Sequence, residues 1–172
     1  MSRARVLQPE TIPCEKIKII ANNWKEHVPA DPGLYFYCPR TAISYPFGYS
    51  RIAYIGKAKN LANRLAWHFS VDMRTPLIEE LPALAWFYQN YFLGGPSDQI
   101  VDIKFVRCIG ESGIESDIER LFLGMFAVMF GAIPLCNGSV QRKRVSQTYR
   151  RYKDDQIVCD VNRILRSMSE KD

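Results

Sequence analysis

The sequence predicts an α+β fold with a small antiparallel β-sheet flanked by helices. Short runs rich in aromatic and β-branched residues predict strands, and longer segments with apolar residues at helical spacing predict helices. Their order is helix, strand, strand, helix, helix, strand, helix, which is typical of this class. The 172 residues, 47% of them hydrophobic, suffice for one ordinary packed core, so residues 1–172 are predicted to form a single domain.

The N-terminal part is predicted to hold one helix and one β-hairpin. Residues 1–12 are expected to be a loose arm, and residues of about 14–27 have the apolar spacing of a short helix. Two strand-like runs follow, Leu34–Cys38 and Arg51–Ile55. The intervening residues 39–50 contain proline and glycine, so we expect a hairpin with a long connecting loop.

The C-terminal part is predicted to be mainly helical. Asn60 is a suitable cap for a helix over residues 61–69, and residues 76–93 form another helical candidate. Val101–Cys108 alternates as a strand. The remaining predicted segments are a long helix over about 116–130, a basic tail over 141–153 and a last amphipathic stretch from Ile157 to Leu165.

The composition favours a protein of a reducing compartment with no membrane span. The five cysteines show no Cys-x-x-Cys spacing and there are only two histidines, so no zinc site is expected. Free thiols and the lack of a secretory signal lead us to expect a cytoplasmic protein. The longest uncharged apolar stretch, Leu121 to Leu135, has fifteen residues, short of the roughly 20 that span a bilayer. The net charge of +5 is compatible with a polyanion partner.

Several short motifs follow one another along the chain. Gly-Leu-Tyr opens the first predicted strand of the hairpin, and Tyr-Ile-Gly ends the second. A lysine-rich turn leads into the next helix, which carries an arginine and a histidine four residues apart. These elements are Gly33-Leu34-Tyr35, Tyr54-Ile55-Gly56, Lys57-Ala58-Lys59-Asn60-Leu61, Arg64 and His68, followed by Glu119 and Pro134-x-x-Asn137.

This set of motifs resembles the GIY-YIG nuclease superfamily over residues of about 33–137. The run from Tyr54 to Phe69 is especially similar to the nuclease module of the bacterial excision-repair incision subunit, and it also resembles phage-type homing endonucleases. The resemblance implies a GIY-YIG nuclease core at 33–137. Within this core we expect an internal insert at 70–99, and outside it an N-terminal arm and extra helix at 1–32 and a basic C-terminal extension at 138–172.

The resemblance also implies hydrolysis of DNA phosphodiester bonds with Mg²⁺ (or Mn²⁺) as the cofactor. A single carboxylate with waters and substrate oxygens is a normal Mg²⁺ arrangement, and Glu119 is the expected metal ligand. Glu115 is the rival ligand, and a solvated acid in the first helical turn is the alternative for Glu119. The candidate catalytic residues are Tyr35, Tyr54, Lys57, Arg64, His68, Glu119 and Asn137.

Residue chemistry supports these roles. Arg64 and His68 are spaced i, i+4, so they share one helix face, and a guanidinium can bind two phosphate oxygens. Tyr35 and Tyr54 lie on neighbouring strands, where their hydroxyls can converge. Nearby cations favour a phenolate, and we expect Tyr35 to be the general base, with Tyr54 and His68 orienting water or sharing its proton.

A basic cluster near the C-terminus is the candidate DNA contact. The alternative is an ordinary solvated surface. Three aromatic residues of the long loop, Tyr45, Phe47 and Tyr49, either stack on bases or pack the loop tip. The candidate DNA-binding residues are Arg142, Lys143, Arg144, Arg150, Arg151 and Lys153.

The leading functional hypothesis is a site-specific endonuclease of the restriction type acting on double-stranded DNA. No separate DNA-binding domain is recognisable, so recognition is expected to lie in loops and flanking segments. Such enzymes cut both strands as a homodimer on DNA or by repeated nicking. The alternatives are a repair or structure-specific nuclease, and a non-catalytic nucleic-acid-binding module. The last is disfavoured by the presence together of Tyr35, Tyr54, Arg64, His68 and Glu119.

Overall fold

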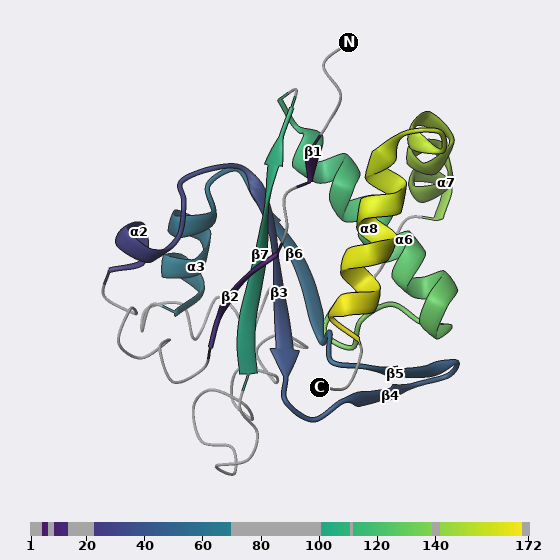
Figure 1. Ribbon diagram of the computed structural model, residues 1–172, viewed down its shortest axis with the longest axis horizontal. Coiled ribbons are helices and arrows are strands. Elements are labelled where there is room, and N and C mark those ends of the chain that lie inside the picture. The colour runs from purple at the N-terminus through teal and green to yellow at the C-terminus, as the bar shows by residue number, and fades with distance from the viewer. Residues whose placement is uncertain are drawn as a thin grey trace.

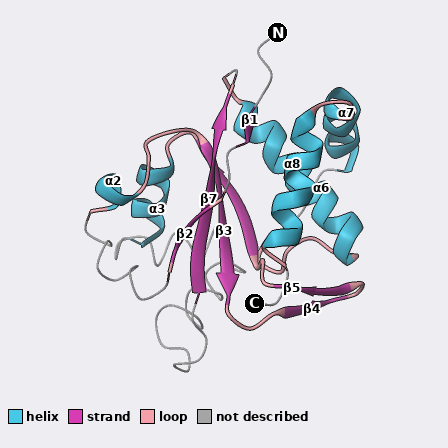
Figure 2. Cartoon of the chain, in the orientation of Figure 1, coloured by secondary structure: helices cyan, strands magenta, loops and turns pink. Residues whose placement is uncertain are grey.

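The computed structural model describes residues 5–6, 9–13, 23–69, 101–110, 112–138 and 142–169 (Figure 1). These residues form an α+β fold in which helices flank a small antiparallel sheet, as predicted (Figure 2). The predicted helix over residues 76–93 lies outside the described residues. Of the predicted helix over 14–27, the structure describes only its end, α2 (Trp24–His27).

Strand β3 (Gly33–Pro39) is the centre of the sheet. It pairs antiparallel with β6 (Tyr54–Ala58) on one side and with β7 (Val101–Ile109) on the other. All seven residues of β3 are buried, because neighbouring strands cover both of its edges and helices cover both of its faces. The predicted hairpin of two antiparallel strands is therefore confirmed.

The expectation of a loose N-terminal arm is wrong. Strands β1 (Arg5–Val6) and β2 (Glu10–Ile12) both pair antiparallel with β7, on the edge away from β3. The physical reason is that β7 is long and its outer edge carries unpaired backbone N–H and C=O groups. The arm supplies partners for these groups, and in doing so it removes an exposed sheet edge.

The bounds of the second hairpin strand also differ from the prediction of Arg51–Ile55. The strand is β6, which starts three residues later, and the long loop contains a small hairpin of β4 (Ile43–Tyr45) and β5 (Gly48–Ser50). The Tyr45 hydroxyl donates to the Ile52 carbonyl at 2.7 Å. This bond holds the end of the loop just before β6.

The two faces of the sheet carry different helices. Alternation along β3 directs Tyr35 and Tyr37 to one face, where they pack with Leu61 and Leu65 of α3 (Leu61–Phe69). Leu34, Phe36 and Cys38 point to the opposite face, which α6 (Ile114–Phe130) and α8 (Gln156–Ser167) cover. Figure 1 shows α2 and α3 on one side of the sheet and α6, α7 and α8 on the other.

Helix α3 begins where the sequence indicates. Asn60 caps it as predicted, because its side-chain Oδ1 accepts from the Asn63 amide at 2.9 Å. The helix sits close to β3 because Gly33 has no side chain, and a Cβ there would collide with the Val106 carbonyl and with Leu61.

The basic segment is a helix, α7 (Arg142–Tyr152), so its description as a tail was incomplete. Helix α7 packs against α6 at Gly124, where a Cβ would collide with Val145. The absent side chain lets the two helices approach closely. The predicted amphipathic stretch that follows is confirmed as α8, since Ile157, Val161 and Ile164 are buried. Among the described residues, no helix is long and apolar enough to cross a membrane.

Gly33→Ala is expected to destabilise the fold by about 1–3 kcal/mol, the usual cost of overpacking a core. The added methyl group would displace either the Val106 backbone or Leu61. Urea unfolding midpoints measure the change. Gly138→Ala is the matched control, because a Cβ there meets no atom within 4 Å. Equal midpoints for the two variants would show that α3 does not depend on Gly33.

Candidate active site

Three tyrosines and one histidine form a compact group between β3, β6 and α3. The ring centroids of Tyr35 and Tyr54 are 5.8 Å apart, and those of Tyr37 and Tyr54 are 5.5 Å apart in a stacked arrangement. Tyr35 and Tyr37 are two residues apart on β3, so both project to the α3 face. The convergence of Tyr35 and Tyr54 that the sequence indicated is present.

His68 lies between two of these tyrosines. Its Nε2 is 3.1 Å from the Tyr35 hydroxyl, and its Nδ1 is 3.0 Å from the Tyr37 hydroxyl. Both ring nitrogens therefore have hydrogen-bond partners within the protein. Burial, with the positive charge of Arg64 adding to it, lowers the pKa of His68 to about 3. The imidazole is consequently neutral at physiological pH, and His68 is buried in the core.

Gly56 makes room for this group. It lies opposite Tyr35 in the β3–β6 register, and the end of the Tyr35 ring lies over it. A Cβ at Gly56 would collide with Tyr35 and would come within 2.7 Å of the Tyr54 ring. The Tyr-Ile-Gly motif therefore places one aromatic ring and, two residues later, the gap that admits a second ring.

The tyrosines are less acidic than the sequence indicated. Burial raises the pKa of Tyr35 well above its ordinary value, and the neighbouring Tyr54 and Tyr37 add to the effect. Burial also raises the pKa of Tyr54, although the hydrogen bond from Tyr35 and the charge of Arg64 lower it again in part. Nearby cations thus do not outweigh desolvation here, which corrects the expectation that they favour a phenolate.

The two tyrosines differ in accessibility. Tyr35 is completely buried, whereas 9% of Tyr54 is exposed. The interaction between the two side chains adds to the raised pKa of Tyr35 and partly lowers that of Tyr54. Tyr54 is therefore the solvent-side end of the group.

Arg64 lies beside the tyrosines as its helical spacing indicated. It is half-buried, and its guanidinium lies 5.0 Å from the centre of the Trp67 ring. Its positive charge lowers the pKa of Tyr35, Tyr54 and His68. The arrangement holds a cation at the border of the group, where a phosphate oxygen can reach it.

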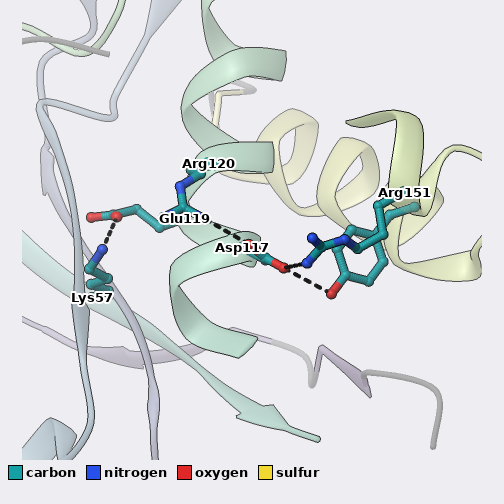
Figure 3. A network of polar contacts seen from close by, with 6 residues as sticks. Lys57, Asp117, Glu119, Arg120 and Arg151 are labelled. Atoms are coloured by element: carbon teal, nitrogen blue, oxygen red, sulfur yellow. Dashed lines mark hydrogen bonds and ion pairs between the residues drawn. The ribbon is translucent and has the colours of Figure 1, made fainter. Parts of the chain in front are cut away.

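Lys57 and Glu119 meet on the opposite side of β6. The Lys57 Nζ is 2.9 Å from Glu119 Oε2, and Figure 3 shows the Glu119 side chain reaching from α6 toward β6. The negative charge of Glu119 raises the pKa of Tyr54, so the carboxylate and this tyrosine are electrostatic neighbours. Because β6 is an edge strand in the described sheet, side chains from both of its faces can converge around it.

Glu119 is suitable for a hard divalent cation. Its side chain is 18% exposed, and a lone carboxylate can hold Mg²⁺ that keeps its waters and takes phosphate oxygens. The described residues contain no cluster of three His, Cys, Asp or Glu side chains that could hold a metal ion. The rival Glu115 is buried near Cys108, a poor position for a hydrated ion.

Asn137 contacts backbone rather than the tyrosine group. Its Oδ1 accepts from the Ile55 amide at 3.0 Å, and its Nδ2 donates to the Ile55 carbonyl at 2.8 Å. The side chain thus occupies the free edge of β6 in the way that a neighbouring strand would. Asn137 positions the strand that bears Tyr54 and Lys57.

The candidate DNA-binding residues lie on and just beyond α7. Lys143, Arg144 and Arg150 are exposed on this helix, and Lys153 follows it. Arg142 belongs to the helix, but its side chain lies outside the described residues. Arg151 is different, because its Nη1 pairs with Asp117 of α6 at 2.8 Å.

The ion pair of Arg151 ties α7 to the helix that bears Glu119. Figure 3 shows Asp117 and Glu119 pointing to opposite sides of α6, the first toward Arg151 and the second toward Lys57. The Tyr152 hydroxyl also donates to Asp117, at 3.1 Å. The basic helix is thereby fixed beside the first turns of α6.

The loop aromatics differ in burial. Tyr45 is buried, and its ring packs edge-on against Phe126 at 5.1 Å between centroids. Phe47 and Tyr49 are exposed, Phe47 to 74%. The Phe47 amide donates to the Phe130 carbonyl at 3.1 Å, which fixes the hairpin tip against the end of α6.

Sequence reasoning did not identify Tyr37, which contacts His68 directly. The sequence did place Tyr37 beside the candidate Tyr35, because residues two apart on a strand share one face. It was weak, since the chain has nine tyrosines. The direct pairing of Lys57 with Glu119 was also not foreseen, because it depends on the distance between β6 and α6.

Comparisons with protein-family models, with curated proteins and with solved structures found no match to this chain. The resemblance to the GIY-YIG superfamily therefore rests on the sequence motifs alone.

Below about pH 6.5, the ordinary pKa of histidine, the unfolded chain binds a proton at His68 that the folded chain does not. The contribution of neutral His68 to the free energy of unfolding is therefore full above that pH. It falls by about 1.4 kcal/mol per pH unit as the pH drops toward 3. Urea unfolding of His68→Gln should show a flatter pH dependence than the wild type between about pH 6 and 4.5. His27→Gln, at an exposed histidine, should keep the wild-type slope. Identical slopes for all three proteins would contradict a buried neutral His68.

Proposed function

We propose that this chain is a Mg²⁺-dependent DNA endonuclease with a GIY-YIG type of active site. The observation that carries the proposal is the meeting of three chemical groups around β6. Tyr54 ends a buried hydrogen-bonded group, Arg64 supplies a guanidinium beside it, and Glu119 supplies a carboxylate from α6. Phosphodiester hydrolysis needs an activated water, positive charge at the phosphoryl oxygens and support for the leaving oxygen.

Tyr54, rather than Tyr35, is the proposed general base. It is the less buried member of the pair, and its interaction with Tyr35 partly offsets the rise in its pKa that burial causes. Tyr35 is completely buried, and its hydroxyl already has two partners, His68 and Tyr54. A buried donor of this kind can adjust the acidity of the base without contacting substrate.

The other residues bind and position the scissile phosphate. Arg64 presents its guanidinium to non-bridging oxygens, where a planar fork gives two hydrogen bonds. Glu119 would hold the ion, and Mg²⁺ when bound supplies positive charge to the phosphoryl and leaving oxygens. Lys57 neutralises Glu119 in the absence of substrate and is placed to donate to a phosphate oxygen when the pair opens. Asn137 keeps β6 in place beneath them.

Double-stranded DNA is the proposed substrate and partner, and the exposed basic face of α7 is the proposed phosphate-binding surface. The clamp between Arg151 and Asp117 holds this face in a fixed relation to Glu119 on the same helix. A rigid link of this kind sets the distance between the DNA backbone bound at α7 and the reacting phosphate. Restriction-type cleavage at one sequence is the leading form of this proposal, and a repair or structure-specific nuclease is its alternative.

Incubation of the protein with a long unmethylated DNA and Mg²⁺, followed by sequencing of the ends, tests the proposal. Discrete ends at one sequence are expected, and a chelator should abolish cutting because a single carboxylate holds the ion weakly. Glu119→Gln should lose cleavage while keeping DNA binding in a gel shift. Glu26→Gln, at an exposed glutamate on α2, should cut like the wild type.

Three outcomes would contradict parts of this proposal. Full activity after exhaustive chelation would contradict the requirement for a metal ion. A Glu119→Gln rate above about a tenth of normal would contradict Glu119 as the metal ligand, since a lost electrostatic contact of this kind usually costs 100-fold or more. Cutting of branched or damaged DNA alone would indicate a repair nuclease. Binding without any cutting would indicate a nucleic-acid-binding module.

Replacing Lys143, Arg144 and Arg150 by alanine is expected to weaken DNA binding and to reduce its salt dependence. Each lost phosphate contact should lower the log–log slope by about 0.9. The measurement is the dissociation constant over a series of salt concentrations. The matched control removes three positive charges elsewhere, through Lys25→Ala, Arg163→Ala and Arg166→Ala. Equal slopes for the two triple variants would show that α7 does not contact the backbone.

A further inference from the structure

The carboxylate of Glu119, the proposed metal ligand, already has a cation beside it. The Nζ atom of Lys57 lies 2.9 Å from Glu119 Oε2, and Figure 3 shows the two side chains meeting between β6 and α6. Strand β6 is itself held in place, since Lys57 pairs with Leu34 in the strand register and Asn137 bonds to the β6 backbone. The ion pair therefore joins two elements whose positions are set by other contacts.

The other cations beside this part of α6 are paired with a different carboxylate. Arg120 and Arg151 contact Asp117 at 2.7 and 2.8 Å. Figure 3 shows Asp117 and Glu119 on opposite sides of α6. Among the side chains that the structure describes, Lys57 is therefore the cation that contacts Glu119.

The two partners differ in their access to solvent. The Lys57 side chain is 40% exposed, whereas the Glu119 side chain is 18% exposed. A lysine ammonium sits on a flexible stem of four carbons. The Lys57 ammonium can therefore leave the carboxylate without any change in the strand that carries it.

An ammonium group and a divalent cation compete for one carboxylate. Mg²⁺ needs oxygen lone pairs, and the Lys57 ammonium engages one oxygen of Glu119 as a donor. An ion at the second oxygen would still lie near a positive charge, which repels it. A DNA phosphate relieves both effects, because its oxygens attract the ammonium and also add ligands to the ion.

We propose that Lys57 keeps a metal ion off Glu119 in the free protein and moves to a phosphate when DNA binds, so that metal and DNA bind cooperatively. The inference rests on the proposed function, in which Glu119 is the metal ligand and DNA is the substrate. Linkage then requires that DNA tighten metal binding by the same factor by which the metal tightens DNA binding. The protein thus takes up its ion mainly where a phosphate is present to be cut.

Binding of Mn²⁺ to the full chain without DNA, followed by the electron paramagnetic resonance of the free ion, tests this inference. Mn²⁺ is the probe because it prefers the same oxygen ligands as Mg²⁺. Lys57→Met removes the positive charge and keeps an unbranched side chain. It should bind Mn²⁺ more tightly than the wild type by about 10-fold or more, the scale for one charge at a partly exposed site. Lys57→Arg keeps the charge and should bind as weakly as the wild type.

Lys59→Met is the matched control, because it removes one positive charge at an exposed lysine two residues along the chain. Its Mn²⁺ affinity should remain that of the wild type. Adding Glu119→Gln to Lys57→Met should remove the gain, which assigns the bound ion to this carboxylate. An unchanged affinity in Lys57→Met would overturn the inference, and so would an equal gain in Lys59→Met.

The wild-type protein provides a second measurement that does not depend on the folding of a variant. A random-sequence DNA duplex should tighten its Mn²⁺ binding, after subtraction of the ions that the duplex alone holds. Equal Mn²⁺ affinities with and without the duplex would overturn the inference.

The Mg²⁺ dependence of cleavage separates this inference from the proposed function. Lys57→Met should reach half-maximal cleavage at a lower Mg²⁺ concentration than the wild type, although its maximal rate should fall with the lost phosphate contact. An unchanged or higher Mg²⁺ requirement would overturn the inference. Tighter Mn²⁺ binding in Lys57→Met, together with a wild type that cuts no DNA, would overturn the proposed function and leave the competition at Glu119 intact.

Discussion

The close approach of the Tyr35 ring to the backbone of Gly56 is the contact on which the rest of the site depends. Strands β3 and β6 pair so that these residues lie opposite each other, and only a glycine leaves room for the ring. The ring in this position brings the Tyr35 hydroxyl to His68 on one side and to Tyr54 on the other. Another residue at position 56 would separate these partners while leaving the sheet in place.

A second constraint is that β6 lies at the edge of the sheet. Its alternating side chains reach both faces, so Tyr54 joins the group under α3 while Lys57 meets Glu119 of α6. Helices α3 and α6, which lie on opposite faces of the sheet, can therefore both contribute side chains to the proposed reaction centre. The free edge is held by the Asn137 amide, which satisfies the Ile55 backbone and keeps the strand from pairing with another chain.

The sequence indicated much of the fold and most of the site, for identifiable reasons. Aromatic and β-branched residues located β3, alternation located β7, and a side-chain cap located α3. Helical spacing placed Arg64 on the same face of α3 as His68, beside the tyrosines. The pairing of residues 5–12 with β7 was not predictable, because such short strands depend on an edge supplied by residues far along the chain. The burial of His68 was also not predictable, since helical spacing shows which face of the helix a residue occupies but not the size of the residues that pack against it.

Single-turnover cleavage rates of Tyr54→Phe and Tyr35→Phe test the central claim most directly, namely that the buried chain of hydroxyls ends on the reacting residue. Each variant removes one hydroxyl and keeps the ring. Tyr54→Phe is expected to cut slower by a factor of about 100 or more, the usual scale for loss of a positioned base, and Tyr35→Phe to retain more activity. A nearly active Tyr54→Phe beside an inactive Tyr35→Phe would contradict the account and make the buried tyrosine the base.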